Sequence, residues 1–271
     1  MHSMKLICLL IGFLVAAVEN PAIAARVAGV EPDALKYSTQ LIVVTTANWD
    51  AVTGQLQRYE RGAAHKRWRK TGAPISIVVG KNGLGWGIGI IATDAPGIRR
   101  ATDPIKKEGD GRGPAGVFTL GTAFGYAQQP LPGLKLPYLN LTPTIECVDD
   151  VGSKHYNRIV DHSTVAPDWN SSEHMRSVGE AYRWGVVVGH NGGVTQGDAS
   201  RPIPGGGSCV FLHIWRNSGQ GTAGCTAMPQ DELETLLKWL DPARKPLLVQ
   251  LPAPEYSRLR ELWRLPPLAG D

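Results

Sequence analysis

Charged residues are scarce in this 271-residue sequence. Asp, Glu, Lys and Arg make up 19% of it, and hydrophobic residues make up 42%. That balance excludes a disordered polar chain and indicates a globular protein with a sizeable core. Long helical patterns are also few, whereas glycine occurs 32 times and proline 20 times. The sequence therefore predicts a mainly β architecture that is rich in turns.

An apolar run long enough to span a membrane comfortably is missing as well. The run at residues 6–18 is too short, follows Lys5, and leads into an Ala-x-Ala pattern that ends at Ala24. These features predict a secretory signal peptide at residues 1–24, with a retained N-terminal anchor as the alternative. We expect a secreted protein without stable membrane insertion.

Cysteine is rare, with four in the chain. Cys8 leaves with the signal peptide, so Cys147, Cys209 and Cys225 remain. In an oxidising compartment an odd count implies one free thiol if the other two pair. A bridge between Cys147 and Cys209 that leaves Cys225 reduced is one possibility. Three free thiols are the other, and the sequence does not decide between them.

The most informative stretch is residues 206–228, which contains a short apolar strand followed by a polar, glycine-rich turn. Alternation along the strand puts Phe211 and His213 on one face. The turn can fold back and bring Cys225 within hydrogen-bonding reach of His213. An imidazole that takes the thiol proton creates a nucleophile, and the amide of Gly224 could receive an oxyanion. The alternative is a buried structural cysteine beside a core histidine.

Three other polar stretches are weaker candidates for chemistry. Residues 106–118 are rich in glycine but lack the Gly-Lys-Ser/Thr ending of a phosphate loop, so we expect a turn between strands. Residues 147–162 contain His and Asp without a metal-site spacing, and we expect a loop lining a cleft, with no metal. Residues 58–70 are basic, but secretion argues against nucleic acid, so we expect a solvated hairpin face.

The remaining patterns predict individual elements. Strands are expected at residues 40–46, 52–61, 75–79, 186–191 and 246–251. Residues 172–182 have modest helical character, and leucines at one-face spacing predict a helix at residues 229–240. The tail at residues 252–271 is rich in proline, with a short surface helix at residues 256–263.

Two segments resemble the L,D-transpeptidase (YkuD-type) catalytic domain. One is residues 211–213 and 222–228, Phe-Leu-His and Thr-Ala-Gly-Cys-Thr-Ala-Met, which is similar to the family's histidine followed by Ser-x-Gly-Cys. The other is residues 113–118, Gly-Pro-Ala-Gly-Val-Phe, which is similar to Thr-Pro-x-Gly-x-Phe. The resemblance covers about residues 75–250. Ile214 replaces a glycine that is common in the family, and Ala227 replaces its usual arginine.

The resemblance implies a mixed β-sandwich or barrel-like catalytic domain with a few short helices at residues 25–251. It implies a periplasmic or cell-envelope transferase of cell wall biogenesis and cell shape, exported across the inner membrane. Cys225 would be the nucleophile and His213 the general base, with Thr222 and the Gly224 backbone beside them. Cys225 would attack a peptidoglycan stem peptide and form a thioester, which an amine resolves into a cross-link.

The partners and alternatives follow from the same reading. We expect His190, Asn191, Trp215 and Arg216 to contact substrate, with Arg216 standing in for the missing arginine. We expect peptidoglycan stem peptides as partners, no cofactor, no nucleic acid and a monomer. Water as the acceptor would make the protein an L,D-carboxypeptidase. A wall-binding module that has lost the chemistry is the contrasting alternative.

Overall fold

The computed structural model describes residues 33–63, 66–192 and 201–268, so the predicted signal peptide lies outside the described residues. The protein is mainly β, with a closed eight-stranded barrel and a few short helices. The strand order is β10-β11-β12-β3-β2-β1-β13-β5, and β10 pairs back onto β5 to close the barrel. The barrel strands are β1 (Gln40–Thr46), β2 (Thr53–Glu60), β3 (Arg69–Val78), β5 (Gly113–Gly125), β10 (Trp184–Val188), β11 (Phe211–Ile214), β12 (Thr226–Met228) and β13 (Leu247–Pro252).

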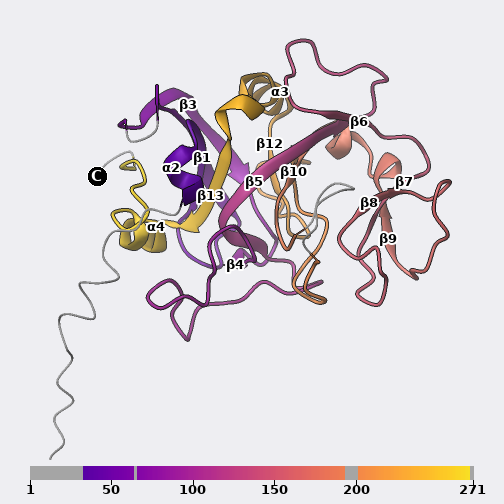
Figure 1. Cartoon of the computed structure of the whole chain (residues 1–271), viewed down its shortest axis with the longest axis horizontal. Helices are drawn as coiled ribbons and strands as arrows, with labels where there is room; N and C mark the ends of the chain where they lie inside the picture. Colours follow the sequence, from indigo (N-terminus) through magenta and orange to yellow (C-terminus); the bar gives the residue numbers. More distant parts are fainter. Residues whose placement is uncertain (1–32, 64–65, 193–200, 269–271) are drawn as a thin grey trace, which may run out of the picture.

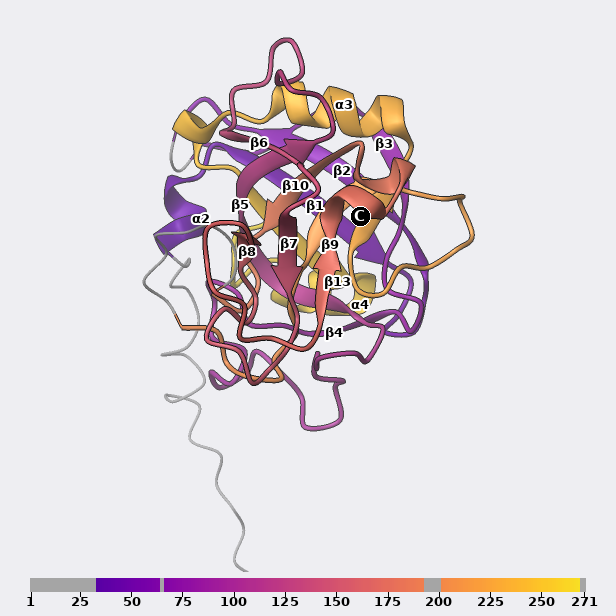
Figure 2. The same ribbon diagram turned by 90° about the vertical axis from the view of Figure 1, so that its right-hand side faces the viewer.

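The other elements surround this barrel (Figure 1). β4 (Leu84–Trp86) and β6 (Tyr138–Asn140) each pair in parallel with β5. A separate three-stranded sheet contains β7 (Ile145–Val148), β8 (Ile159–Asp161) and β9 (Ser172–His174). It lies at the right of the barrel in Figure 1 and in front of the barrel in Figure 2. The helices are α2 (Asp33–Tyr37), α3 (Gln230–Trp239) and α4 (Ala253–Leu259), with the 3₁₀ turns η1 (Met175–Ser177), η2 (Glu180–Tyr182) and η3 (Pro242–Arg244).

The barrel forms because its central strands are apolar on both faces. β1 and β13 pair in parallel and are almost completely buried. Such continuous runs of apolar and β-branched residues suit strands that are covered on both sides. The predicted strands at residues 40–46, 75–79 and 246–251 are confirmed, and so is the helix near residues 229–240. In α3 the buried side chains are Leu233, Leu236 and Leu237.

The C-terminal residues are part of the folded core, which corrects the expectation of a proline-rich tail with a surface helix. α4 forms near the predicted position, but Tyr256 is 0% and Leu259 1% exposed. Trp263, just after α4, is 2% exposed and belongs to the main core. The prolines end the strand and start the helix, where a fixed φ is favourable.

Two further expectations are wrong in part. Residues 172–182 do not form one helix, because they contain β9, η1 and η2. Residues 147–162 are not a simple loop, because they contribute to two strands of the small sheet. The basic hairpin at residues 58–70 is mostly exposed, but Arg61 is buried, donates to the Ser38 carbonyl and stacks on Trp68.

A disulfide joins the small sheet to the barrel. Cys147 of β7 is bonded to Cys209, just before β11, and Cys225 is the free cysteine among the described residues. Of the two possibilities left open by the sequence, the structure has the bridged one. The bridge holds β7 and its neighbour β9 against the strand that leads to His213.

Across the described ranges, the search for a helix long and apolar enough to cross a bilayer finds none.

Candidate active site

The stretch singled out in the sequence forms two adjacent strands of the barrel. β11 and β12 run parallel, with Leu212 opposite Thr226 and His213 opposite Ala227. This pairing puts Cys225, which directly precedes β12, beside Phe211 at the start of β11. Cys225 and His213 both line one pocket with a volume of about 430 Å³. The two residues therefore share one pocket, but the hydrogen bond predicted between them is not among the contacts of Cys225.

Cys225 is a buried free thiol with three polar neighbours. The Phe211 amide donates to Sγ at 3.3 Å, and Sγ lies 3.5 Å from the Cys209 carbonyl oxygen. The Tyr182 hydroxyl is the third polar neighbour of the sulfur, and its own proton is donated to Glu173 Oε1. Burial raises the pKa of the Cys225 thiol to about 12, and the negative charge of Glu173 adds to the rise. The resting sulfur is thus a neutral thiol at pH 7.

His213 is oriented by its own strand. Its Nδ1 lies 2.8 Å from the Ile214 carbonyl oxygen, and its ring meets the Tyr182 ring edge-on at 5.3 Å. Since a carbonyl only accepts, Nδ1 carries the proton and Nε2 keeps a lone pair. Burial lowers the pKa of His213 to about 4, so the imidazole is neutral at pH 7. The partners of Sγ given above do not include His213, so this base would engage the thiol only after a small movement.

The turn before Cys225 is held by Thr222. Its hydroxyl donates to the Cys225 carbonyl at 2.6 Å and accepts from the Gly224 amide at 3.1 Å. The Gly224 amide is therefore already occupied, which corrects the expectation that it is free to receive an oxyanion. Gly224 is instead required for close packing, because a Cβ there would meet the Arg112 carbonyl at 3.1 Å.

His190 and Asn191 do not lie in the pocket, contrary to their predicted role in substrate contact. β10 is next to β11, but the strands are antiparallel and Gly185 stands opposite His213. His190 and Asn191 follow the end of β10 at Val188, on the side directed away from His213, and neither lines the pocket. Both side chains are buried; Asn191 bonds to the backbone of Ile203, and His190 Nε2 lies 3.0 Å from the Gly206 carbonyl. They hold residues 203–207 in place.

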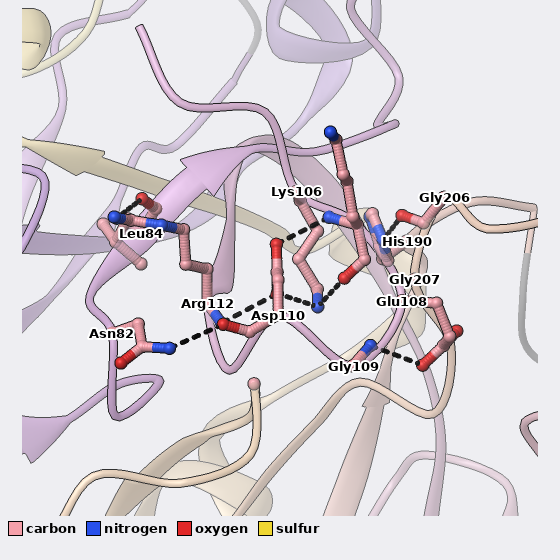
Figure 3. A network of polar contacts seen from close by, with 12 residues as sticks. Asn82, Leu84, Lys106, Glu108, Gly109, Asp110, Arg112, His190, Gly206 and Gly207 are labelled. Atoms are coloured by element: carbon pink, nitrogen blue, oxygen red, sulfur yellow. Dashed lines mark hydrogen bonds and ion pairs between the residues drawn. The ribbon is translucent and has the colours of Figure 1, made fainter.

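Trp215 and Arg216 do line the pocket, as expected. A second cation, Lys106, also lines it, although the side chain is almost fully buried. Lys106 Nζ donates to Asp110 Oδ1 and to the Lys107 carbonyl, each at 2.7 Å (Figure 3). An ammonium has three donors, so the contacts that the described residues make with it leave one for a ligand.

The sequence analysis missed three other polar residues of this pocket, Glu173, Tyr182 and Ser208, whereas a fourth, Asp149, belongs to the stretch at residues 147–162 that we expect to line a cleft. Glu173 comes from β9 and Tyr182 from η2, and the Tyr182 hydroxyl donates to Glu173 Oε1 at 2.5 Å. Asp149 follows β7 and Ser208 precedes the disulfide. Among the described residues, Asp149 Oδ1 and Ser208 Oγ are buried atoms without a hydrogen-bond partner. These residues belong to no recognisable motif, and only the folding of the small sheet onto the barrel brings them to Cys225.

No group of three or more His, Cys, Asp or Glu side chains in the described part of the chain is arranged to hold a metal ion. Carboxylates in the polar stretch at residues 147–162 instead accept hydrogen bonds from the backbone of nearby loops. Asp150, for example, accepts from the Gly152 and Asn170 amides.

Comparisons with known proteins say little about this site. A comparison with models of protein families finds no match, and one with curated proteins finds none either. A solved structure of Bdellovibrio bacteriovorus Bd1075 matches with a TM-score of 0.36 and 11% identity. The match covers 84% of this chain and 55% of that chain, so this chain spans about half the length of the matched one. A likeness this weak supports no argument about activity.

Proposed function

We propose that this protein is an L,D-transpeptidase-like cysteine acyltransferase that acts on peptidoglycan stem peptides in the bacterial cell envelope. The observation that carries the proposal is the free Cys225 thiol in one pocket with His213, whose Nδ1–H is held by a backbone carbonyl. That arrangement leaves Nε2 as a base for the thiol proton. The resemblance in residues 211–228 adds the substrate class.

The proposed reaction has two steps. In the first, Sγ of Cys225 attacks a stem-peptide carbonyl while its proton passes to His213 Nε2. The terminal amino acid leaves as an amine that takes this proton, and the remaining stem is held as a thioester. In the second, an amine of another stem attacks the thioester, which forms the cross-link and returns the thiol.

The cations of the pocket support a substrate with a carboxylate. Ala227 is 0% exposed within β12, so the position of the family's usual arginine cannot contact a ligand here. Lys106 and Arg216 line the same pocket from other segments. We propose that they bind the carboxylate that this arginine would otherwise contact.

The test is the mass of the intact protein after incubation with a tetrapeptide-stem muropeptide or with a carbapenem. We expect an adduct on the wild type and on Arg216→Lys, and none on Cys225→Ala. We expect His213→Gln to form the adduct at least about 100-fold more slowly, because general-base catalysis is lost. A wild type that forms no adduct and leaves the muropeptides unchanged would exclude this proposal and favour a non-catalytic wall-binding module.

The fate of the thioester separates the two enzyme activities. Cross-linked dimers among the muropeptide products would identify a transpeptidase. Shortened tripeptide stems without dimers would identify an L,D-carboxypeptidase, in which water replaces the amine.

A further inference from the structure

Tyr182 lies between two groups that compete for its proton. Its hydroxyl is 2.5 Å from Glu173 Oε1, and it is also a hydrogen-bond partner of Cys225 Sγ. A hydroxyl has one proton, so Tyr182 donates to Glu173 or to the sulfur, but not to both. Tyr182 is 3% exposed, and its ring is packed against Phe124 and Phe211. The hydroxyl therefore cannot leave this position, and only its proton can turn.

The charge of Glu173 decides where that proton points. An ionised carboxylate only accepts hydrogen bonds, so it takes the Tyr182 proton and leaves lone pairs facing Sγ. Lone pairs favour the S–H form of Cys225. If the charge of Glu173 is neutralised, the Tyr182 proton can turn to Sγ and stabilise a thiolate. The pKa of Cys225 responds in the same direction, because the charge of Glu173 raises it.

Other charges face the sulfur from neighbouring segments. Lys106, from the loop before β5, opposes Glu173 by lowering the pKa of Cys225. Burial raises the pKa of Glu173, and the negative charge of Asp149, from the end of β7, adds to the rise. His213, from β11, is neutral at rest. Lys106 is already paired with Asp110, so the positive charge that reaches Glu173 and Asp149 must come from elsewhere.

This wall of the pocket has acceptor atoms in excess. Asp149 Oδ1 and Ser208 Oγ have no partner in the described residues, and Glu173 receives a hydrogen bond from Tyr182. Unpaired buried acceptors are costly, and a ligand with several N–H donors and a positive charge would satisfy them. A primary ammonium group has these properties.

We propose that a primary ammonium group of the substrate docks against Glu173 and Asp149, and that this neutralisation turns the Tyr182 hydroxyl to Cys225 and activates the thiol. The Cys225 proton passes to His213 Nε2, and Tyr182 keeps its own proton throughout. Tyr182 is then a catalytic residue, because it touches the reacting sulfur, and Glu173 is a positioning residue that acts through it. The proposal rests on Cys225 being the nucleophile.

The first experiment measures the rate at which iodoacetamide alkylates Cys225 between pH 6 and pH 10. We expect Glu173→Gln to raise the rate about tenfold at each pH, since removing a neighbouring negative charge lowers a thiol pKa by about one unit. Adding Tyr182→Phe to this variant should reverse most of the gain. Glu180→Gln is the matched control, because Glu180 is an exposed carboxylate on η2 that does not line the pocket.

The second experiment adds a ligand to the wild type and uses Glu173→Gln as the control. Methylammonium chloride should accelerate alkylation of the wild type relative to sodium chloride at equal ionic strength. It should have no effect on Glu173→Gln. An unchanged rate in Glu173→Gln, or equal acceleration of both proteins by methylammonium, would overturn the proposal.

The outcome is distinguishable from failure of the proposed function. If the carbapenem adduct forms on Cys225 but Glu173→Gln alkylates like the wild type, only the present inference is wrong. If no adduct or muropeptide product forms but the alkylation rates change as expected, the proposed acyltransferase activity is wrong. The effect of Glu173 on the reactivity of Cys225 is then still confirmed.

Discussion

Removing the Cys147–Cys209 disulfide should destabilise the protein by about 4 kcal/mol. The bridge closes a loop with a sequence separation of 62, and the loss of unfolded-state entropy for a loop of that length gives this magnitude. The loop contains β8, β9 and β10, so it restrains much of the unfolded chain. The assay is urea unfolding, and it compares the free energy of unfolding of two proteins. One is Cys225→Ala, and the other carries Cys147→Ala and Cys209→Ala in addition. Both lack Cys225, so thiol exchange is avoided.

The urea m-value should also increase, because an unfolded chain without the bridge exposes more surface. As a control, a reducing agent should destabilise the Cys225→Ala protein by a similar amount and leave the variant without the bridge unchanged. A stability difference below about 1 kcal/mol would refute the reasoning. It would mean that the small sheet is held to the barrel by packing alone and that the bridge restrains little of the unfolded chain.

Three other predictions concern acid, the C-terminal core and the cysteine turn. Burial lowers the pKa of both His190 and His213 to about 4. Between pH 6.5 and pH 4 the unfolded chain therefore binds protons that the folded chain does not, and stability falls as the pH falls through this window. The free energy of unfolding should fall by about 2 kcal/mol per histidine between pH 7 and pH 5. In urea unfolding, His190→Gln should lose only half as much stability over this interval as the wild type. An equal loss in the two proteins would contradict the assignment to the histidines. Trp263→Ala should lower the free energy of unfolding by about 3–5 kcal/mol in the same assay, because a large buried ring is removed. A decrease below about 1 kcal/mol would show that residues 253–268 are not part of the folded core. Thr222→Ala should cost about 1 kcal/mol and slow carbapenem adduct formation on Cys225, whereas Thr222→Ser should restore both; equal behaviour of the two variants would show that the hydroxyl does not hold the turn.

Local patterns in the sequence predict the strands and the pair at the centre of the site. The alternation of Phe211, Leu212 and His213 puts the histidine on the pocket face, as the structure has it. The glycine-rich turn returns Cys225 to the same pocket. These predictions succeed because they depend on residues close together in the chain, where strand period and turn chemistry are sufficient.

Predictions that depend on strand register fail. The strand predicted at residues 186–191 is present as β10, which ends at Val188 and does lie beside β11, but the polar residues that follow it are directed away from His213. Nothing local distinguishes a parallel from an antiparallel pairing of two short apolar strands. The same limit hides Glu173, which reaches the pocket because β9 pairs with Cys147 of β7 and the disulfide fixes β7 on the barrel.

The protonation states of Cys225 and His213 show why the charge of Glu173 matters for the reactivity of the thiol. With a thiol pKa of about 12 and an imidazole pKa of about 4, moving the proton from Cys225 to His213 in the free protein is uphill by on the order of 10 kcal/mol. The protein without a bound ligand should therefore alkylate slowly at pH 7, although Cys225 is a free cysteine. A ligand can lower this cost by removing the negative charge at Glu173 and by adding a hydrogen bond from Tyr182 to the sulfur. If Cys225 is the nucleophile that we propose, the same argument predicts that a substrate with a primary ammonium group acylates Cys225 much faster than a small neutral electrophile alkylates it.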